Sequence, residues 1–252
     1  TMEKRPFNDY HERKGATTML DELKSVINTN PRSIPVILLL DCSGSMYGPK
    51  IEALNNAVNV MLDTFAREAD SDTSIKTAII AFGGADAKVI REFGAPSKDE
   101  KIKLSADGMT PLGCALNLAK DHIIEDREVI ASRDYRPTVI LVSDGMPNDD
   151  WESALDKFIH DGRSSKCFRW ALSIGVDRGT PAYQMLKKFV SDEEFIFDTS
   201  SAAGLYRFFQ RVTVSVVTRT RTMNPNKMAS PEEEQALESC IGYPVDDDDI
   251  PF

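Results

Sequence analysis

Two segments of the sequence place oxygen-bearing side chains directly after apolar runs. Asp41, Ser43 and Ser45 follow the first run, and Asp144 follows a second run about a hundred residues later. The alternation in the first segment puts three oxygen donors on one side of an extended turn, and Gly44 permits the tight bend that turns them inward. Hydroxyls and carboxylates in this arrangement favour a hard cation, because such cations prefer oxygen ligands.

The cation that best suits these donors is Mg²⁺, with Mn²⁺ as a second candidate and Ca²⁺ as a poorer one. Mg²⁺ requires octahedral oxygen coordination and retains several waters, so a few hydroxyls with carboxylates acting partly through water fit it. Few direct negative charges would leave the ion electrophilic and ready to accept a carboxylate from another molecule. The pattern therefore predicts a docking point for an Asp or Glu of a partner.

The elements that must position these residues alternate along the chain as strands and helices. Apolar runs predict strands at residues 34–40, 75–82, 138–142, 168–176 and 194–197. Helical spacing predicts helices at residues 51–65, 111–128, 151–160, 181–190 and 202–217. Residues 88–93 follow a glycine-containing turn and are expected to run antiparallel at an edge. The order predicts an α/β, doubly wound, Rossmann-like fold: a mostly parallel six-stranded sheet with one antiparallel edge strand and helices on both faces.

In an open α/β sheet, ligands bind outside the carboxyl ends of the strands, where the strand order reverses. Asp41 and Asp144 both follow strands, so we expect them at one crevice. Thr110 precedes the second predicted helix, which it can cap.

Five residues together match a known pattern of DxSxS, a distant Thr and a distant Asp: Asp41, Ser43, Ser45, Thr110 and Asp144. The chain resembles the von Willebrand factor A (VWA) domains with a metal-ion-dependent adhesion site over about residues 33–217. The resemblance implies that Ser43, Ser45 and Thr110 ligate the metal through hydroxyls. It implies that Asp41 and Asp144 hold waters and orient the serines.

The resemblance also implies a function in protein interaction. We expect a non-catalytic, metal-dependent adaptor whose partner donates an Asp or Glu to the metal. The expected partner-binding surface comprises the loops around Met46, Tyr47, Met109, Pro111 and Met146. Within the family the chain looks most like the bacterial tellurite-resistance, TerY-like proteins, which are intracellular. Their genomic neighbours suggest work with a protein kinase and a phosphatase in stress or phage-defence signalling.

Composition limits the partners and the compartment. Of the 252 residues, 30 are Lys or Arg and 40 are Asp or Glu, so the net charge of −10 disfavours nucleic acid. No apolar run approaches the roughly 20 residues that span a bilayer, and no signal segment is visible, so we expect a cytoplasmic protein without a membrane partner. We divide the chain into an extension with a short helix (1–32), the VWA domain (33–222) and a mobile acidic tail (223–252).

Simpler interpretations exist for each residue. Ser43, Ser45 and Thr110 can cap helices, and Asp144 can form an Asx turn. All four residues would then have to stand at the right strand ends for four unrelated structural reasons. Asp149 and Asp150 precede Trp151 and are expected to cap that helix; we do not place them among the ligands.

Two other functions would also use a metal or an anion, and each needs residues that this sequence lacks. A phosphoryl-transfer enzyme of the haloacid dehalogenase type would need DxDx[TV], and here Ser43 replaces the second Asp, which removes the general acid/base. A protein that binds metals or oxyanions in metal stress would need more soft ligands. The glycine-rich nucleotide-binding motifs and the G-x-S-x-G elbow are absent from the sequence. We therefore expect no catalysis.

Overall fold

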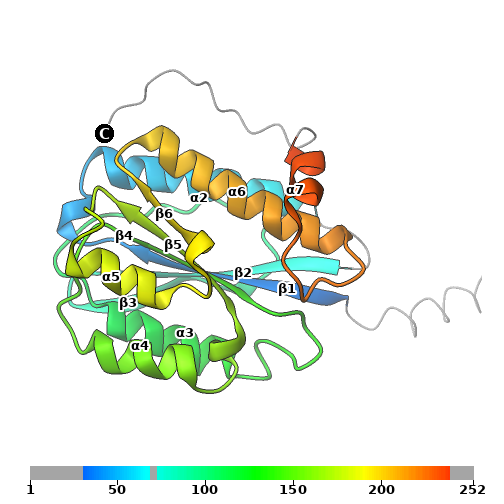
Figure 1. Ribbon diagram of the computed structural model, residues 1–252, viewed down its shortest axis with the longest axis horizontal. Coiled ribbons are helices and arrows are strands. Elements are labelled where there is room, and N and C mark those ends of the chain that lie inside the picture. Colours follow the sequence, from blue (N-terminus) through cyan, green and yellow to red (C-terminus); the bar gives the residue numbers. More distant parts are fainter. Residues whose placement is uncertain (1–30, 69–72, 239–252) are drawn as a thin grey trace, which may run out of the picture. The chain divides into compact units, whose positions relative to one another are not determined.

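A computed structural model describes residues 31–68 and 73–238, which form a six-stranded sheet flanked by helices (Figure 1). The strand order is β3-β2-β1-β4-β5-β6. The strands are β1 (Arg32–Asp41), β2 (Thr73–Gly83), β3 (Asp86–Gly94), β4 (Thr138–Ser143), β5 (Phe168–Ile174) and β6 (Ile196–Thr199). Neighbours pair in parallel except β2 and β3, which are antiparallel. The predicted fold class, with its antiparallel edge strand, is confirmed.

Strand β1 lies at the centre of the sheet, between β2 and β4. Every side chain from Ser33 to Asp41 is buried, as expected for a strand covered by helices on both faces. The chain passes from β1 to β2 on one side and later returns to β4 on the other side. Strand order thus reverses at β1, so the carboxyl ends of β1 and β4 border the crevice in which such sheets bind ligands.

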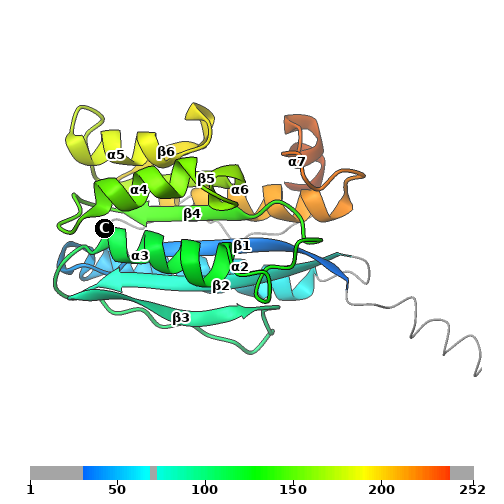
Figure 2. The same cartoon turned by 90° about the horizontal axis from the view of Figure 1, so that it is seen from below.

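Helices cover both faces of the sheet, as Figures 1 and 2 show from two directions. Helices α2 and α6 pack against each other on one face, and α3 and α4 pack against each other on the opposite face, where α5 also lies. In the described residues no helix is long and apolar enough to cross a membrane. The helices are α2 (Pro49–Arg67), α3 (Leu112–Ala119), α4 (Trp151–His160), α5 (Pro181–Phe189), α6 (Ala202–Arg221) and α7 (Pro231–Glu238).

Helix α3 is shorter than the sequence predicted. It ends at Ala119 and continues as one π-helical turn, η2 (Lys120–Ile124), in which the Glu125 N–H donates to the Lys120 carbonyl at 2.9 Å. The wider turn still buries Ile123 and Ile124, so the apolar spacing alone did not reveal where the α-helix ends.

The segment after residue 222 also differs from the prediction of a mobile acidic tail. Its first part contains α7, which packs against α6 and buries Leu237. Ser230 and Glu233 form a capping box: the Ser230 N–H donates to the Glu233 carboxylate at 2.8 Å, and the Glu233 N–H donates to Ser230 Oγ at 3.3 Å. Acidic side chains are favourable at a helix N-terminus, so this charge run starts a helix.

Two regions of the prediction lie outside the described residues. They are the extension up to residue 30, with its expected short helix, and residues 239–252, with Asp246–Asp249.

Candidate metal centre

Three loops meet at the carboxyl ends of β1 and β4: loop 1 (residues 41–47), loop 2 (107–111) and loop 3 (143–149). Loop 1 is bonded to loop 2, because the Gly44 N–H donates to the Gly108 carbonyl at 3.0 Å. Loop 2 is bonded to loop 3 twice: the Thr110 N–H donates to Asn148 Oδ1 at 3.1 Å, and the Asn148 N–H donates to the Thr110 carbonyl at 3.3 Å. Backbone hydrogen bonds therefore fix the three loops relative to one another.

The close approach of loop 2 to the β2–β3 turn requires glycine. Gly108 has a φ of 63°, and a Cβ built there would lie 2.6 Å from the Cα of Gly84. Beside this contact, the Met109 N–H donates to the Gly84 carbonyl at 3.0 Å. Because a backbone atom blocks the site, any other residue at position 108 would have to move the loop that carries Thr110.

Side-chain oxygens of loops 1 and 3 form one connected cluster. The hydroxyls of Ser43 and Ser45 are 3.0 Å apart, and Ser45 Oγ donates to Asp144 Oδ1 at 2.6 Å. Lys50, in the first turn of α2, places Nζ 2.7 Å from Asp144 Oδ2. The Asp144 side chain is only 1% exposed, so the amino group of Lys50 compensates a buried carboxylate.

Asp41 holds loop 1 against the sheet. It is fully buried; its Oδ1 accepts the Ser43 N–H at 2.9 Å, and its Oδ2 accepts the Ser143 hydroxyl at 2.7 Å. Burial raises the pKa of Asp41, the charge of Asp144 acts in the same direction, and the bonds from Ser143 and Ser43 oppose the rise. Asp41 thereby joins β1 to β4 at the point where loop 1 begins.

The structure connects four of the five predicted ligands through hydrogen bonds that run from Asp41 through Ser43 and Ser45 to Asp144. Thr110 is attached through its backbone, to loop 3 at Asn148 and to the first turn of α3 at Leu112. Its loop is thus placed beside the serines, and the bonds that hold it do not use its hydroxyl.

The predicted role of Asp149 was wrong. Its carboxylate accepts the N–H groups of Gly113 at 3.0 Å and Cys114 at 2.9 Å, so it caps α3 instead of α4. Asp150 is the N-cap residue of α4 but makes no side-chain capping bond. The starts of α3 and α4 lie side by side only after folding. In the sequence Asp149 is close to α4 alone, which is why the prediction assigned it to that helix.

Lys50, Ser143 and Asn148 were missed by the sequence reasoning. Ser143 carried a usable signal, because it is a polar residue at the end of an apolar run and directly precedes Asp144. Lys50 and Asn148 carried none, since each looks like an ordinary surface residue until the loops are assembled.

The rim of the cluster is apolar and exposed. Tyr47, Met109 and Met146 are 79%, 58% and 44% exposed, one from each of the three loops. Met46 and Pro111, which lie in two of the loops expected to form the partner-binding surface, are themselves buried.

The chemistry of the donors is that of a hydroxyl-rich site. Across residues 31–68 and 73–238, no group of three or more His, Cys, Asp or Glu side chains is arranged to hold a metal ion. The cluster supplies two carboxylates and serine hydroxyls, which suit hard cations better than soft ones.

Comparison with known proteins identifies the fold and the domain. A family model described as the von Willebrand factor type A domain matches residues 36–211. Similar solved structures include proximal thread matrix protein 1 from the mussel byssus with a zinc-occupied MIDAS motif (20% identity, TM-score 0.54, covering 78% of this chain and 51% of that chain). No curated protein matches the chain.

Two further neighbours come from bacteria. The pilus adhesin SpaC from Lactobacillus rhamnosus GG is 14% identical, with a TM-score of 0.58 over 76% of this chain and 31% of that one. A von Willebrand factor type A protein from Catenulispora acidiphila is 22% identical, with a TM-score of 0.53 over 74% of this chain and 43% of that one. The chain spans only a third to a half of the length of these neighbours.

Proposed function

The chain belongs to the von Willebrand factor type A domain family, and from that premise we propose that it is a non-catalytic module that binds a partner protein through a divalent metal ion. The metal is Mg²⁺ in this proposal, with Mn²⁺ as the second choice. Ser43, Ser45 and Thr110 would hold it through hydroxyls, and Asp41 and Asp144 would hold its waters. When bound, the ion would supply a Lewis-acidic position that accepts a carboxylate of the partner.

The donors fit such an ion. The Ser43 and Ser45 hydroxyls are already adjacent at 3.0 Å, and Asp144 is within 2.6 Å of Ser45 Oγ. Asp41 accepts the N–H of Ser43 and the hydroxyl of Ser143, which ties loop 1 to β4, so the donors are preorganised. The zinc-occupied MIDAS motif of the mussel protein supports a divalent ion at this kind of site.

The observation that carries the interaction function is the exposed apolar rim. Tyr47, Met109 and Met146 are the exposed large hydrophobic side chains of loops 1 to 3, and loops 1 and 3 also carry the oxygen cluster. Tyr and Met are enriched at protein interfaces, where apolar contact area supplies affinity and a few polar groups supply orientation. A metal-bound carboxylate surrounded by this rim would give a partner both anchor and contact surface.

A more specific assignment rests on the resemblance of residues 34–41 and 110–116 to TerY-like proteins. In this proposal the chain is a cytoplasmic adaptor of a bacterial stress-response or defence system. Its partner would be a protein kinase or phosphatase that presents an Asp or Glu to the metal.

The experiment that tests the metal site is calorimetric titration of the full chain with Mg²⁺, Mn²⁺ and Zn²⁺. We expect Ser43→Ala combined with Ser45→Ala to weaken binding at least about 100-fold, or about 2.7 kcal/mol, because two ligands are removed. The matched control is Ser153→Ala combined with Ser200→Ala, two exposed serines outside loops 1 to 3, which should bind as the unmodified chain does. Undiminished binding by the Ser43/Ser45 variant would contradict the site.

The interaction is tested with peptides bearing a single Glu or, as the control, a Gln at the same position. Metal-dependent binding of the Glu peptide alone supports the proposed function. Metal-dependent hydrolysis of a phosphate ester, abolished by the Ser43/Ser45 variant, would instead favour the phosphoryl-transfer alternative.

A further inference from the structure

The amino end of the sheet holds a second polar site, far along the strands from loops 1 to 3. A surface cleft of about 670 Å³ lies where the chain enters β4 and β5. Three cationic side chains line it: Arg136, Arg163 and Lys166. Ser132, Ser165 and Tyr135, which carry hydroxyl groups, line it as well.

The three cations have no carboxylate partner within the part of the chain that the structure describes. Arg136 stacks on the ring of Phe168, 3.9 Å from its centroid, and donates from Nε to the Lys166 carbonyl. Arg163 donates from one terminal nitrogen to the Ile130 carbonyl at 2.9 Å and from the other to the Ala131 carbonyl at 3.5 Å. Lys166 is exposed, and neither a hydrogen bond nor an ion pair of its amino group is formed with residues 31–68 or 73–238. None of the three positive charges is therefore neutralised by a carboxylate of these residues.

Asp134 is the carboxylate that lines this cleft, and its oxygens are already bonded. Its Oδ1 accepts the Ser33 N–H at 2.9 Å, and its Oδ2 accepts the Ala131 N–H at 3.0 Å. Asp134 therefore shapes the loop before β4 and is not paired with the three cations.

Further positive charge lies behind the cleft. Arg219 is fully buried; it donates to the Arg136 carbonyl at 2.6 Å, to Thr138 Oγ1 at 2.7 Å and to the Pro225 carbonyl at 2.8 Å. Burial and, to a smaller degree, the charge of Arg136 lower the pKa of Arg219 to about 9. An arginine that is bonded to neutral acceptors keeps its positive charge uncompensated, so it adds to the positive potential at this end of the sheet.

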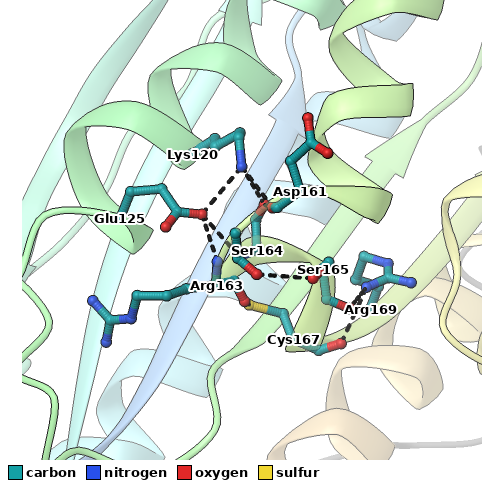
Figure 3. A network of polar contacts seen from close by, with 9 residues as sticks. Lys120, Glu125, Asp161, Arg163, Ser164, Ser165, Cys167 and Arg169 are labelled. Atoms are coloured by element: carbon teal, nitrogen blue, oxygen red, sulfur yellow. Dashed lines mark hydrogen bonds and ion pairs between the residues drawn. The ribbon is translucent and has the colours of Figure 1, made fainter.

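The turn that carries Arg163 and Lys166 is fixed before any ligand binds (Figure 3). Glu125 Oε1 accepts the Arg163 N–H at 2.7 Å, the Ser164 N–H at 3.1 Å and the Lys120 amino group at 3.1 Å. Gly162 has a φ of 69°, and a Cβ there would overlap the Glu125 carboxylate. The carboxylate of Glu125 is therefore used to hold the backbone of the turn, so the turn that carries Arg163 and Lys166 is in place before a ligand binds.

From this arrangement we propose that the cleft formed by Arg136, Arg163 and Lys166 binds a phosphate monoester. A phosphate monoester brings a charge of about −1.5 to −2 and three acceptor oxygens at pH 7, which matches three cations and neighbouring hydroxyls better than a single carboxylate does. Guanidinium groups donate in a planar fork that fits phosphate oxygens. The ester is either a free metabolite or a phosphorylated side chain of a protein.

The cleft stands out because the whole chain is acidic, with a net charge of −10. An anion attracted to the protein would be repelled over most of its surface and held at this end of the sheet. The site is independent of the metal centre, since it lies at the other end of the strands and uses no residue of loops 1 to 3.

The test is a binding titration of the full chain with three probes: inorganic phosphate, a neutral peptide with one phosphoserine, and the same peptide unphosphorylated. EDTA is present throughout, because a metal ion could also bind phosphate. We expect the phosphopeptide or phosphate to bind and the unphosphorylated peptide not to bind. Lys166→Gln should weaken binding about threefold and Lys166→Glu at least about tenfold, since each step removes one further unit of positive charge.

The control is Lys101→Glu, which makes the same charge change on an exposed lysine in the segment that follows β3 at the opposite edge of the sheet. It should alter affinity less than twofold, and thermal melting should show all variants folded. Equal affinity for phosphate and phosphopeptide assigns the site to a free metabolite, and preference for the phosphopeptide assigns it to a phosphoprotein. No binding by the unmodified chain, or equal losses in Lys101→Glu and Lys166→Glu, would overturn the proposal and leave the metal-centre results unaffected.

Discussion

At the carboxyl end of the sheet two buried carboxylates, Asp41 and Asp144, lie among hydroxyls, whereas at the amino end Arg136, Arg163 and Lys166 share a cleft without a carboxylate partner in the described residues. The carboxyl end supplies negative charge and one lysine, so recruiting an anionic partner there requires an added cation. The amino end carries its own positive charge. Binding at the first end is therefore expected to depend on metal concentration, and binding at the second on salt concentration.

The two ends also differ in how their loops are held. Loops 1 to 3 are joined by hydrogen bonds of their backbones, and loop 2 also packs its backbone at Gly108 against Gly84 in the β2–β3 turn. The turn at residues 162–167 is held mainly by side chains: Glu125 accepts two of its N–H groups, and Lys120, Arg136 and Arg169 donate to its oxygen atoms. Backbone contacts cannot adjust, whereas a carboxylate can rotate away. The carboxyl end should therefore tolerate substitution less well than the amino end.

The largest expected effect is that of Gly108→Ala. The new Cβ would meet the Cα of Gly84, and position 108 has a positive φ, so we expect a loss of about 3 kcal/mol in unfolding free energy. Metal affinity should fall as well, because loop 2 carries Thr110. Urea unfolding and calorimetry of the same preparation measure both, and Gly94→Ala, at an open position, is the control.

Gly162→Ala should lower the unfolding free energy by less, about 2 kcal/mol, although the φ of Gly162, 69°, is also positive. The obstacle is the tip of Glu125, which can move and give up part of its hydrogen bonding to the turn. Phosphate binding should weaken while metal binding stays unchanged. If urea unfolding shows that Gly162→Ala and Gly108→Ala lose the same unfolding free energy, the expected difference between the two ends of the sheet is wrong.

We expect Lys50→Met to bind the metal ion about fivefold more tightly, which corresponds to about 1 kcal/mol. The lysine amino group lies 2.7 Å from Asp144 and repels a second cation there. Calorimetry with Mg²⁺ measures the effect, and Lys101→Met serves as the matched control. Weaker metal binding by Lys50→Met would show that Lys50 supports the site instead of opposing the ion.

The smallest effect concerns two buried thiols, one at each end of the sheet. Burial raises the pKa of Cys42 and of Cys167 from 9.0 to about 12. Both thiols should therefore resist iodoacetamide at pH 8 in the folded protein, whereas the exposed Cys114 should react, as peptide mapping by mass spectrometry would show.

The same shift predicts a pH dependence of stability. A thiol whose pKa is raised in the folded state contributes fully to the unfolding free energy below pH 9. This contribution is lost as the pH rises from 9.0 toward about 12, because in that range the thiol releases its proton in the unfolded state and keeps it in the folded state. Unfolding free energy in urea should decline over this window. A rise instead of a decline would contradict the burial of these thiols.

The sequence determined the sheet because its signals are local. Apolar runs fixed the strands, and the alternation of strands and helices fixed a parallel sheet with an antiparallel edge, which the structure confirms. Parallel strands bring their carboxyl ends to one end of the sheet, and the strand order places β1 beside β4, so Asp41 and Asp144 follow neighbouring strands. The metal ligands themselves remain a prediction, which rests on the resemblance of Asp41, Ser43, Ser45, Thr110 and Asp144 to the VWA pattern.

Tertiary structure decided the contacts that join distant segments. Asp149 caps α3 and not the helix that follows it, because the two helix starts became neighbours only on folding. Met46 turned inward while Tyr47 beside it remained exposed, since the short helical turn after Ser43 sets their directions. The basic cleft could not be foreseen either: isolated lysines and arginines are ordinary surface residues, and only the packing of the segments before β4 and β5 placed three of them around one cavity.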